Sequence, residues 1–160
     1  MDQSKKKINF KSYKMSMIPE HFRKTILEWT NEGNEYLYEE QPERMTLLEQ
    51  WLYDQELKID EPIYRRTDWD PILRAQEGDV IKSTRVSSWS RNRMIPDAKY
   101  EGIKSVLLIL EKTTVKGVDV MEISSYFEEE EVLLAPANFF VEKREGNVLY
   151  VKYIHNVLSE

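Results

Sequence analysis

The chain has 160 residues, of which 41% are hydrophobic and 32% are charged, and its net charge is -6. This composition suits a hydrophobic core, so we expect residues 1–160 to form one domain with a polar arm over residues 1–17. Acidic net charge and dispersed basic residues argue against a nucleic-acid partner. No segment has the apolar length of a membrane span or a signal peptide, which predicts a soluble, intracellular protein and leaves delivery into another cell open. With no cysteine and two distant histidines, we expect no metal site.

Two amphipathic helices are predicted in the first third of the chain. Apolar side chains recur at helical spacing over residues 19–31, with a proline in the first turn and a glycine just past the end. A second helical pattern covers residues 42–58, and residues 36–38 between the two leave a third short helix open. Both long helices are expected to cover a sheet, with Trp29 and Trp51 in the core.

The periodicity changes to that of strands after residue 62. Residues 63–67 and 86–90 are strand candidates, and the continuous apolar run over 106–110 predicts a central strand. A polar connection is expected over residues 68–77, and an unusually basic loop over residues 91–97.

The C-terminal part predicts an antiparallel hairpin. Residues 139–144 and 148–154 are rich in β-formers, and Glu145-Gly146-Asn147 supplies a tight turn between them. Helices followed by strands, without a repeat or a linker, predict an α+β fold.

Four consecutive glutamates, residues 128–131, lead directly into the apolar residues 132–134 without a turn residue. If the backbone is extended there, Glu129 and Glu131 lie on one side of the strand and Glu130 on the other. Two carboxylates on one rim suit a site that stabilises developing positive charge. A solvated acidic loop before an edge strand is the alternative.

Three separated motifs carry a family resemblance. They are the aromatic-arginine pair Tyr64-Arg65, the motif Ser88-Trp89-Ser90 preceded by Gly78-Asp79-Val80-Ile81, and Glu129-Glu130-Glu131 between residues 123–127 and the run 132–136. In this order and context they resemble the Arg, Ser-x-Ser and Glu-x-Glu signature of the arginine-specific mono-ADP-ribosyltransferases, which include binary-toxin catalytic domains and vertebrate ecto-enzymes. The resemblance covers residues 60–155. It implies N-terminal helices packed on a mixed, largely antiparallel, split β core.

The resemblance also implies a reaction, in which the nicotinamide-ribose bond of NAD breaks and ADP-ribose passes to an arginine of a protein target, without a metal. Glu131 would stabilise the oxocarbenium-like ribose, and Glu129 would orient the acceptor guanidinium and take its proton. Arg65 would bind the pyrophosphate. Ser88 would hydrogen-bond Glu131, with Ser90 in support. A structural ion pair between Arg65 and Glu131, and an ordinary strand serine at position 88, are the alternatives.

Further contacts follow from the same resemblance. Arg66 would face NAD through its backbone, and Arg91 and Arg93 would lie in the loop over the phosphates, unless they are solvated. Tyr126 and Phe127 would recognise the protein target or close the core.

Three positions depart from the family pattern. Trp89 stands where threonine is usual, Val86 where an aromatic residue is usual, and Arg66 where many members have glycine. We expect Trp89 to pack in the core. The departures keep two other functions open, which are an NAD glycohydrolase on the same fold and a catalytically degenerate binding module.

Overall fold

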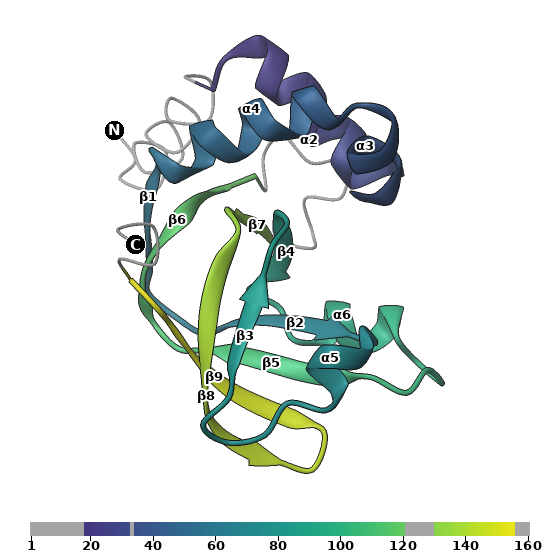
Figure 1. The fold of residues 1–160 in the computed structure, drawn as a ribbon, viewed down its shortest axis with the longest axis vertical. Helices are drawn as coiled ribbons and strands as arrows, with labels where there is room; N and C mark the ends of the chain where they lie inside the picture. The colour runs from purple at the N-terminus through teal and green to yellow at the C-terminus, as the bar shows by residue number, and fades with distance from the viewer. Residues whose placement is uncertain (1–17, 33, 121–129, 156–160) are drawn as a thin grey trace, which may run out of the picture.

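The computed structural model describes residues 18–32, 34–120 and 130–155. Figure 1 shows a layer of helices on one side of a strongly curled sheet. The helices of this layer are α2 (Glu20–Glu32), α3 (Asn34–Glu40) and α4 (Pro42–Tyr53). None of the helices in the described ranges has the length and apolar character needed to cross a membrane. The polar arm predicted over residues 1–17 lies outside the described residues.

The sheet has nine strands in the described part of the chain, in the order β1-β6-β7-β4-β2-β5-β9-β8-β3. The strands are β1 (Glu56–Ile59), β2 (Ile63–Thr67), β3 (Val80–Ser83), β4 (Ser87–Ser90), β5 (Val106–Leu110), β6 (Thr113–Asp119), β7 (Glu131–Leu134), β8 (Ala137–Glu145) and β9 (Val148–Tyr153). Within these residues β5 and β9 are parallel and the other neighbours are antiparallel.

The sheet divides into two parts between β2 and β4. These strands are joined by the single residue pair Tyr64 and Ser90, whereas β2 and β5 are paired from Ile63 to Thr67. In Figure 1 the strand β4 stands upright while β2 and β5 run across the molecule. The α+β class with a split, largely antiparallel core is therefore confirmed.

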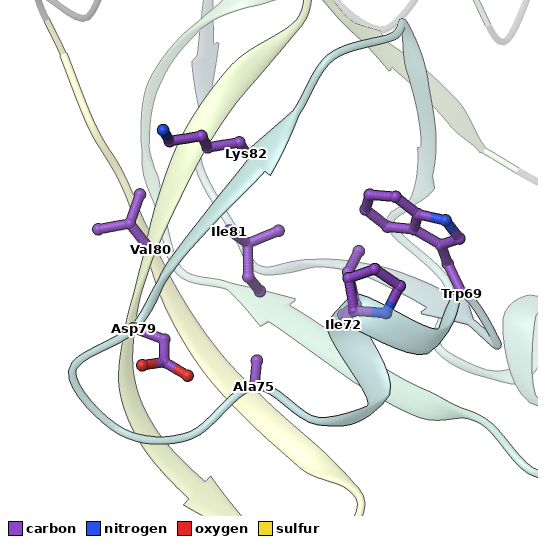
Figure 2. A pocket seen from close by; sticks show the side chains of 8 residues that line it. Trp69, Ile72, Ala75, Asp79, Val80, Ile81 and Lys82 are labelled. Carbon is purple, nitrogen blue, oxygen red and sulfur yellow. The ribbon is translucent and has the colours of Figure 1, made fainter.

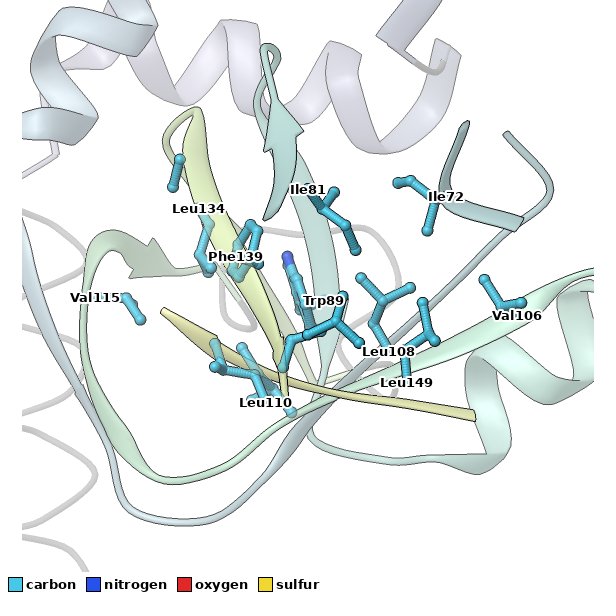
Figure 3. Close-up of a cluster of buried hydrophobic side chains, with 14 of the residues drawn as sticks. Ile72, Ile81, Trp89, Val106, Leu108, Leu110, Val115, Leu134, Phe139 and Leu149 are labelled. Atoms are coloured by element: carbon cyan, nitrogen blue, oxygen red, sulfur yellow. The ribbon is translucent and has the colours of Figure 1, made fainter. Parts of the chain in front are cut away.

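Two clusters of buried side chains hold the layers together. The cluster in Figure 3 centres on Trp89 and Phe139 and includes alternate residues of β5. The second cluster lies under the helices, where Ile26, Leu48 and Leu52 are fully buried. Burying one such side chain stabilises the fold by about 1.5–3 kcal/mol, so the helices are held mainly by this apolar face.

The predicted elements agree with the structure where a long segment of the sequence shows a regular hydrophobic pattern. Both long helices are confirmed, although the second ends at Tyr53 rather than at residue 58, and residues 36–38, left open by the pattern, belong to α3. The strands over 63–67 and 106–110 and the C-terminal hairpin are also confirmed. The run 106–110 is buried at every position, as expected of a strand covered on both faces.

Short elements account for the corrections. The predicted connection over 68–77 contains the helix α5 (Asp70–Leu73), and the predicted loop over 91–97 leads into α6 (Met94–Lys99). Each is too short to show a period, and each buries a single residue, Ile72 or Pro96.

Two strands are further corrections, because residues 56–58 were predicted to end the second helix but belong to β1, and β6 was not predicted. β1 pairs with β6 along one edge of the sheet, and only Ile59 of β1 is buried. In β6 the glycine at position 117 interrupts the run of β-forming residues in the sequence. Its presence has a physical cause, because a Cβ there would lie 2.2 Å from the carbonyl oxygen of Leu133. The close approach of β6 to β7 therefore requires glycine at this position.

Candidate functional site

Residues of the three motifs lie on the adjacent strands β2, β4 and β7 (Figure 1), with Glu131 representing the third. Ser90 lies opposite both Tyr64 of β2 and Glu131 of β7, and Ser88 lies opposite Leu133. Because residues opposite each other share a face of the sheet, Ser88, Ser90 and Glu131 point to the same side. Leu133 belongs to the cluster under the helices, so this side faces the helical layer.

Glu131 is the first residue of β7 and is buried, with 7% of its surface exposed. Backbone hydrogen bonds fix it from both sides. The N–H of Arg91 donates to the carbonyl of Glu130 at 3.2 Å, and the N–H of Val120 donates to the carbonyl of Glu131 at 3.1 Å. The carboxylate therefore sits on an anchored strand end, which suits a group that must be rigidly placed.

The premise of an extended backbone through the glutamates is wrong at Glu130. This residue has a φ of 49°, in the left-handed region that non-glycine residues seldom adopt. Regular alternation therefore starts at Glu131 and cannot be extended backward to locate Glu129. Glu129, Tyr126 and Phe127 lie outside the described residues, and their predicted roles stay predictions.

Arg65 of β2 reaches toward β4. Its guanidinium donates to the carbonyl oxygen of Ser88 at 3.0 Å. Within the described residues no carboxylate lies at ion-pair distance from it, so the alternative ion pair with Glu131 is not formed. Arg65 as a whole is half-buried, but its guanidinium is closely packed. Burial disfavours the charged form and therefore lowers the pKa of the guanidinium. A desolvated cation with a neutral partner is a favourable position for an anionic ligand.

The two serines of the motif have different surroundings. The hydroxyl of Ser88 accepts a hydrogen bond of 2.7 Å from the indole N–H of Trp29 on α2. The hydroxyl of Ser90 accepts from the N–H of Asn92 at 2.9 Å and donates to the carbonyl of Asn92 at 3.1 Å. Ser90 thus shapes the turn after β4, as serine side chains do in local turns.

Trp89 points away from the site. It is 2% exposed and packs against Phe139 with 5.4 Å between ring centroids, in the cluster that Figure 3 shows. Its indole N–H donates to the hydroxyl of Ser87 at 2.8 Å. The expectation that Trp89 packs in the core is confirmed, and the bulky residue in the middle of the motif does not obstruct the face that carries Ser88.

The other arginines predicted to contact NAD have carboxylate partners. Arg91 forms an ion pair of 3.0 Å with Asp119, and both side chains are mostly buried. Arg66 and Arg93 share Asp97 of α6, at 2.8 Å and 3.8 Å. Arg65 differs from all three, which makes it the strongest candidate for an anion contact.

Sequence reasoning missed two helical residues that hold β4. Trp29 was expected only in the core, yet it also contacts Ser88. The hydroxyl of Tyr38 accepts from the N–H of Val86 at 2.8 Å and donates to Glu49 at 2.5 Å. The only available signal was general, because buried tryptophan and tyrosine need a partner for their polar atoms.

The cavity in Figure 2 lies elsewhere. It measures about 320 Å³ and is formed between α5 and β3, with Trp69, Ile72, Val80 and Lys82 among its lining residues. None of the predicted site residues lines it. Among the described residues, no three His, Asp or Glu side chains gather closely enough to hold a metal ion.

Comparisons with known proteins identify the fold. No protein-family model and no curated protein matches the chain. Among solved structures, Plx2a, an ADP-ribosyltransferase toxin from Paenibacillus larvae, matches with a TM-score of 0.68 and 19% identity over 95% of each chain. C3stau2 from S. aureus, solved with NAD, matches with a TM-score of 0.66 and 14% identity over 89% of this chain and 90% of that one.

A third solved structure was determined with a small guanidine compound. The ADP-ribosyltransferase Vis from Vibrio splendidus, in complex with agmatine, matches with a TM-score of 0.57 and 18% identity. The match covers 95% of this chain and 84% of Vis. At these identities the likeness establishes that the chain has the fold of ADP-ribosyltransferases, and its chemistry must rest on its own residues.

Proposed function

We propose that this protein is an NAD-dependent ADP-ribosyltransferase that transfers ADP-ribose from NAD to an arginine of a protein target and releases nicotinamide. The observation that carries the proposal is the convergence of Arg65, Ser88 and Glu131 on three adjacent strands of this fold. These residues come from distant parts of the chain, so only folding can bring them together.

Each residue has a role that its surroundings support. Arg65 binds the pyrophosphate of NAD, because its desolvated guanidinium offers N–H donors in a fork that fits phosphate oxygens. Glu131 lies beside the ribose, where its carboxylate stabilises the positive charge that develops as the bond to nicotinamide breaks. Because that charge appears only in the transition state, a fixed carboxylate accelerates the reaction rather than merely tightening binding.

Two observations support an arginine acceptor. The sequence carries a second carboxylate two residues before Glu131, at Glu129, which is the residue proposed to orient the guanidinium and to take its proton. The structural relative Vis was solved with agmatine, which bears a guanidinium group. The protein that supplies the arginine is a further component of the proposal.

The first test is nicotinamide release from NAD by the purified protein, with and without agmatine. We expect release that agmatine stimulates, and a loss of about 100-fold or more in Glu131→Gln, since one preorganised electrostatic contact is worth about 2.7–4 kcal/mol in a transition state. Glu142→Gln is the matched control, because Glu142 is an exposed residue of β8 that pairs with Lys152.

The other outcomes separate the alternatives. Release that agmatine does not change would indicate a glycohydrolase. If the protein neither releases nicotinamide nor gains thermal stability on adding NAD, the proposal fails and a binding module becomes the better description. Full activity in Glu131→Gln would remove the role given to that residue.

A further inference from the structure

The helical layer makes a direct polar contact with the site. Trp29 is 5% exposed, and its indole N–H, which can only donate, is directed at the Ser88 hydroxyl at 2.7 Å. The two residues are 59 positions apart. A buried indole N–H needs an acceptor, but the helical layer could have supplied one from its own backbone. The contact with the motif serine instead ties α2 to β4 next to Glu131.

This contact sets the direction of the serine proton. A serine hydroxyl has one proton and two lone pairs, so when Trp29 donates to Ser88 the hydroxyl proton must point elsewhere. Among the described residues this hydroxyl has no other hydrogen bond. Ser88 lies opposite Leu133, so Glu131 is its diagonal neighbour on the same face. A diagonal neighbour is within reach of a side chain as long as glutamate, and a carboxylate can only accept.

We infer that Trp29 is a positioning residue: it occupies a lone pair of the Ser88 hydroxyl and so leaves the proton of that hydroxyl available for donation to the carboxylate of Glu131, on the same face of the sheet. The inference rests on the proposed function, because it assigns a purpose to Glu131 that only the reaction requires. An indole that donates to the serine also makes the serine a better donor, since consecutive hydrogen bonds polarise each other. A hydrogen bond from this donor would hold the carboxylate of Glu131 in one rotamer.

A second aromatic contact supports the arrangement. Tyr38 accepts the N–H of Val86 at 2.8 Å, two residues before Ser88 on the same chain segment. Its ring meets that of Trp29 edge to face, with 6.2 Å between centroids. The helices therefore contact the backbone of the residue that precedes β4 and the side chain of Ser88 within β4, so the position of Ser88 depends on the helical layer.

The kinetic test compares two tryptophan variants in that layer. Trp29→Phe keeps an aromatic ring but loses the indole donor, and we expect kcat for nicotinamide release to fall about 5- to 10-fold, as for one lost buried hydrogen bond. KM for NAD should stay within about 2-fold. Trp51→Phe is the control, since Trp51 packs on Phe22 at 5.0 Å and has no polar contact with β4.

Non-additivity makes this test specific. If Trp29 acts through Ser88, the double variant Trp29→Phe with Ser88→Ala should be no slower than Ser88→Ala alone. Multiplied losses in the double variant, or an equal loss in Trp51→Phe, would overturn the inference and leave Trp29 a packing residue.

A structural readout separates this inference from the proposed reaction. The four tryptophans give four indole N–H signals by NMR, and Trp29→Phe identifies one of them. We expect Ser88→Ala and Glu131→Gln each to move that signal, and Glu142→Gln to leave it in place. If the wild type is inactive but both substitutions move the Trp29 signal, the proposed reaction fails while the coupling of Trp29 to Ser88 and Glu131 is supported. If the wild type is active and neither substitution moves the signal, the inference alone fails.

Discussion

The two faces of β4 and β7 differ in chemistry although they belong to the same few residues. On the helix-facing side Ser88, Ser90 and Glu131 form a polar surface, whereas Trp89 and Val132 on the other side are buried in an apolar core. Because side chains alternate along a strand, the middle residue of a three-residue motif points to the opposite face of the sheet from its two neighbours. The comparison teaches that a departure from a motif need not disturb the site, if it falls on the core face.

The largest effect is expected from restoring the threonine that is usual at position 89. Trp89→Thr should destabilise the fold by about 3–5 kcal/mol, the range for large-to-small changes in a core, without raising kcat of the folded protein. Chemical denaturation measures the first quantity, and nicotinamide release at low temperature the second. Trp69→Thr is the control, since Trp69 is 53% exposed and should cost little.

The Trp89 variants can also contradict the assignment of residue 89 to the core face. A gain in activity in Trp89→Thr would mean that residue 89 belongs to the site. If that variant does not fold, Trp89→Phe keeps the question answerable, because it retains most of the packing.

An intermediate effect is expected from Arg65→Lys. Lysine keeps the charge but loses the forked donors, so KM for NAD should rise about 10-fold while kcat changes less. Steady-state kinetics and NAD titration measure this. Arg74→Lys is the matched control, because Arg74 lies on the surface and pairs with Asp70. An unchanged KM in Arg65→Lys would show that the site face does not bind the pyrophosphate through this residue.

The smallest effect concerns a surface contact within the helical layer. Arg44 donates to both carboxylate oxygens of Glu28, and this hydrogen bond lowers the pKa of Glu28. A lowered folded pKa means stability that is present above the unfolded value of 4.5 and is lost as pH falls through the folded pKa. Because the side chains are about one-third exposed, solvent screening limits the contribution to about 0.5 kcal/mol.

Denaturation at two pH values tests this contribution. Glu28→Gln should be less stable than the wild type by about 0.5 kcal/mol at pH 7, and the difference should diminish as pH falls below 4.5. Glu39→Gln, an exposed change on α3, should show no such pH dependence. A difference that persists at low pH would mean that the contact acts through packing rather than through charge.

Long periodic segments could be predicted because their pattern reports burial directly. The helices α2 and α4 and the strand over 106–110 each carry enough apolar residues to indicate which face is covered, although the predicted end of the second helix, residue 58, lies five residues beyond the observed end at Tyr53. The short helices α5 and α6 and the edge strand β1 could not be predicted, because each buries a single residue and is held by its neighbours rather than by its own pattern.

The sequence by itself determined the fold class and the candidate site residues, since both depend on residue type and order along the chain. Only the tertiary structure decided that Arg65, unlike Arg66, Arg91 and Arg93, has no carboxylate at ion-pair distance within the described residues. It also decided that Trp89 turns to the core and that Trp29 donates to Ser88. The physical reason is the separation along the chain over which each effect acts. Alternation and periodicity act between near neighbours, whereas the partner of a polar side chain is set by strand order and by helix packing, which bring together residues far apart in the chain.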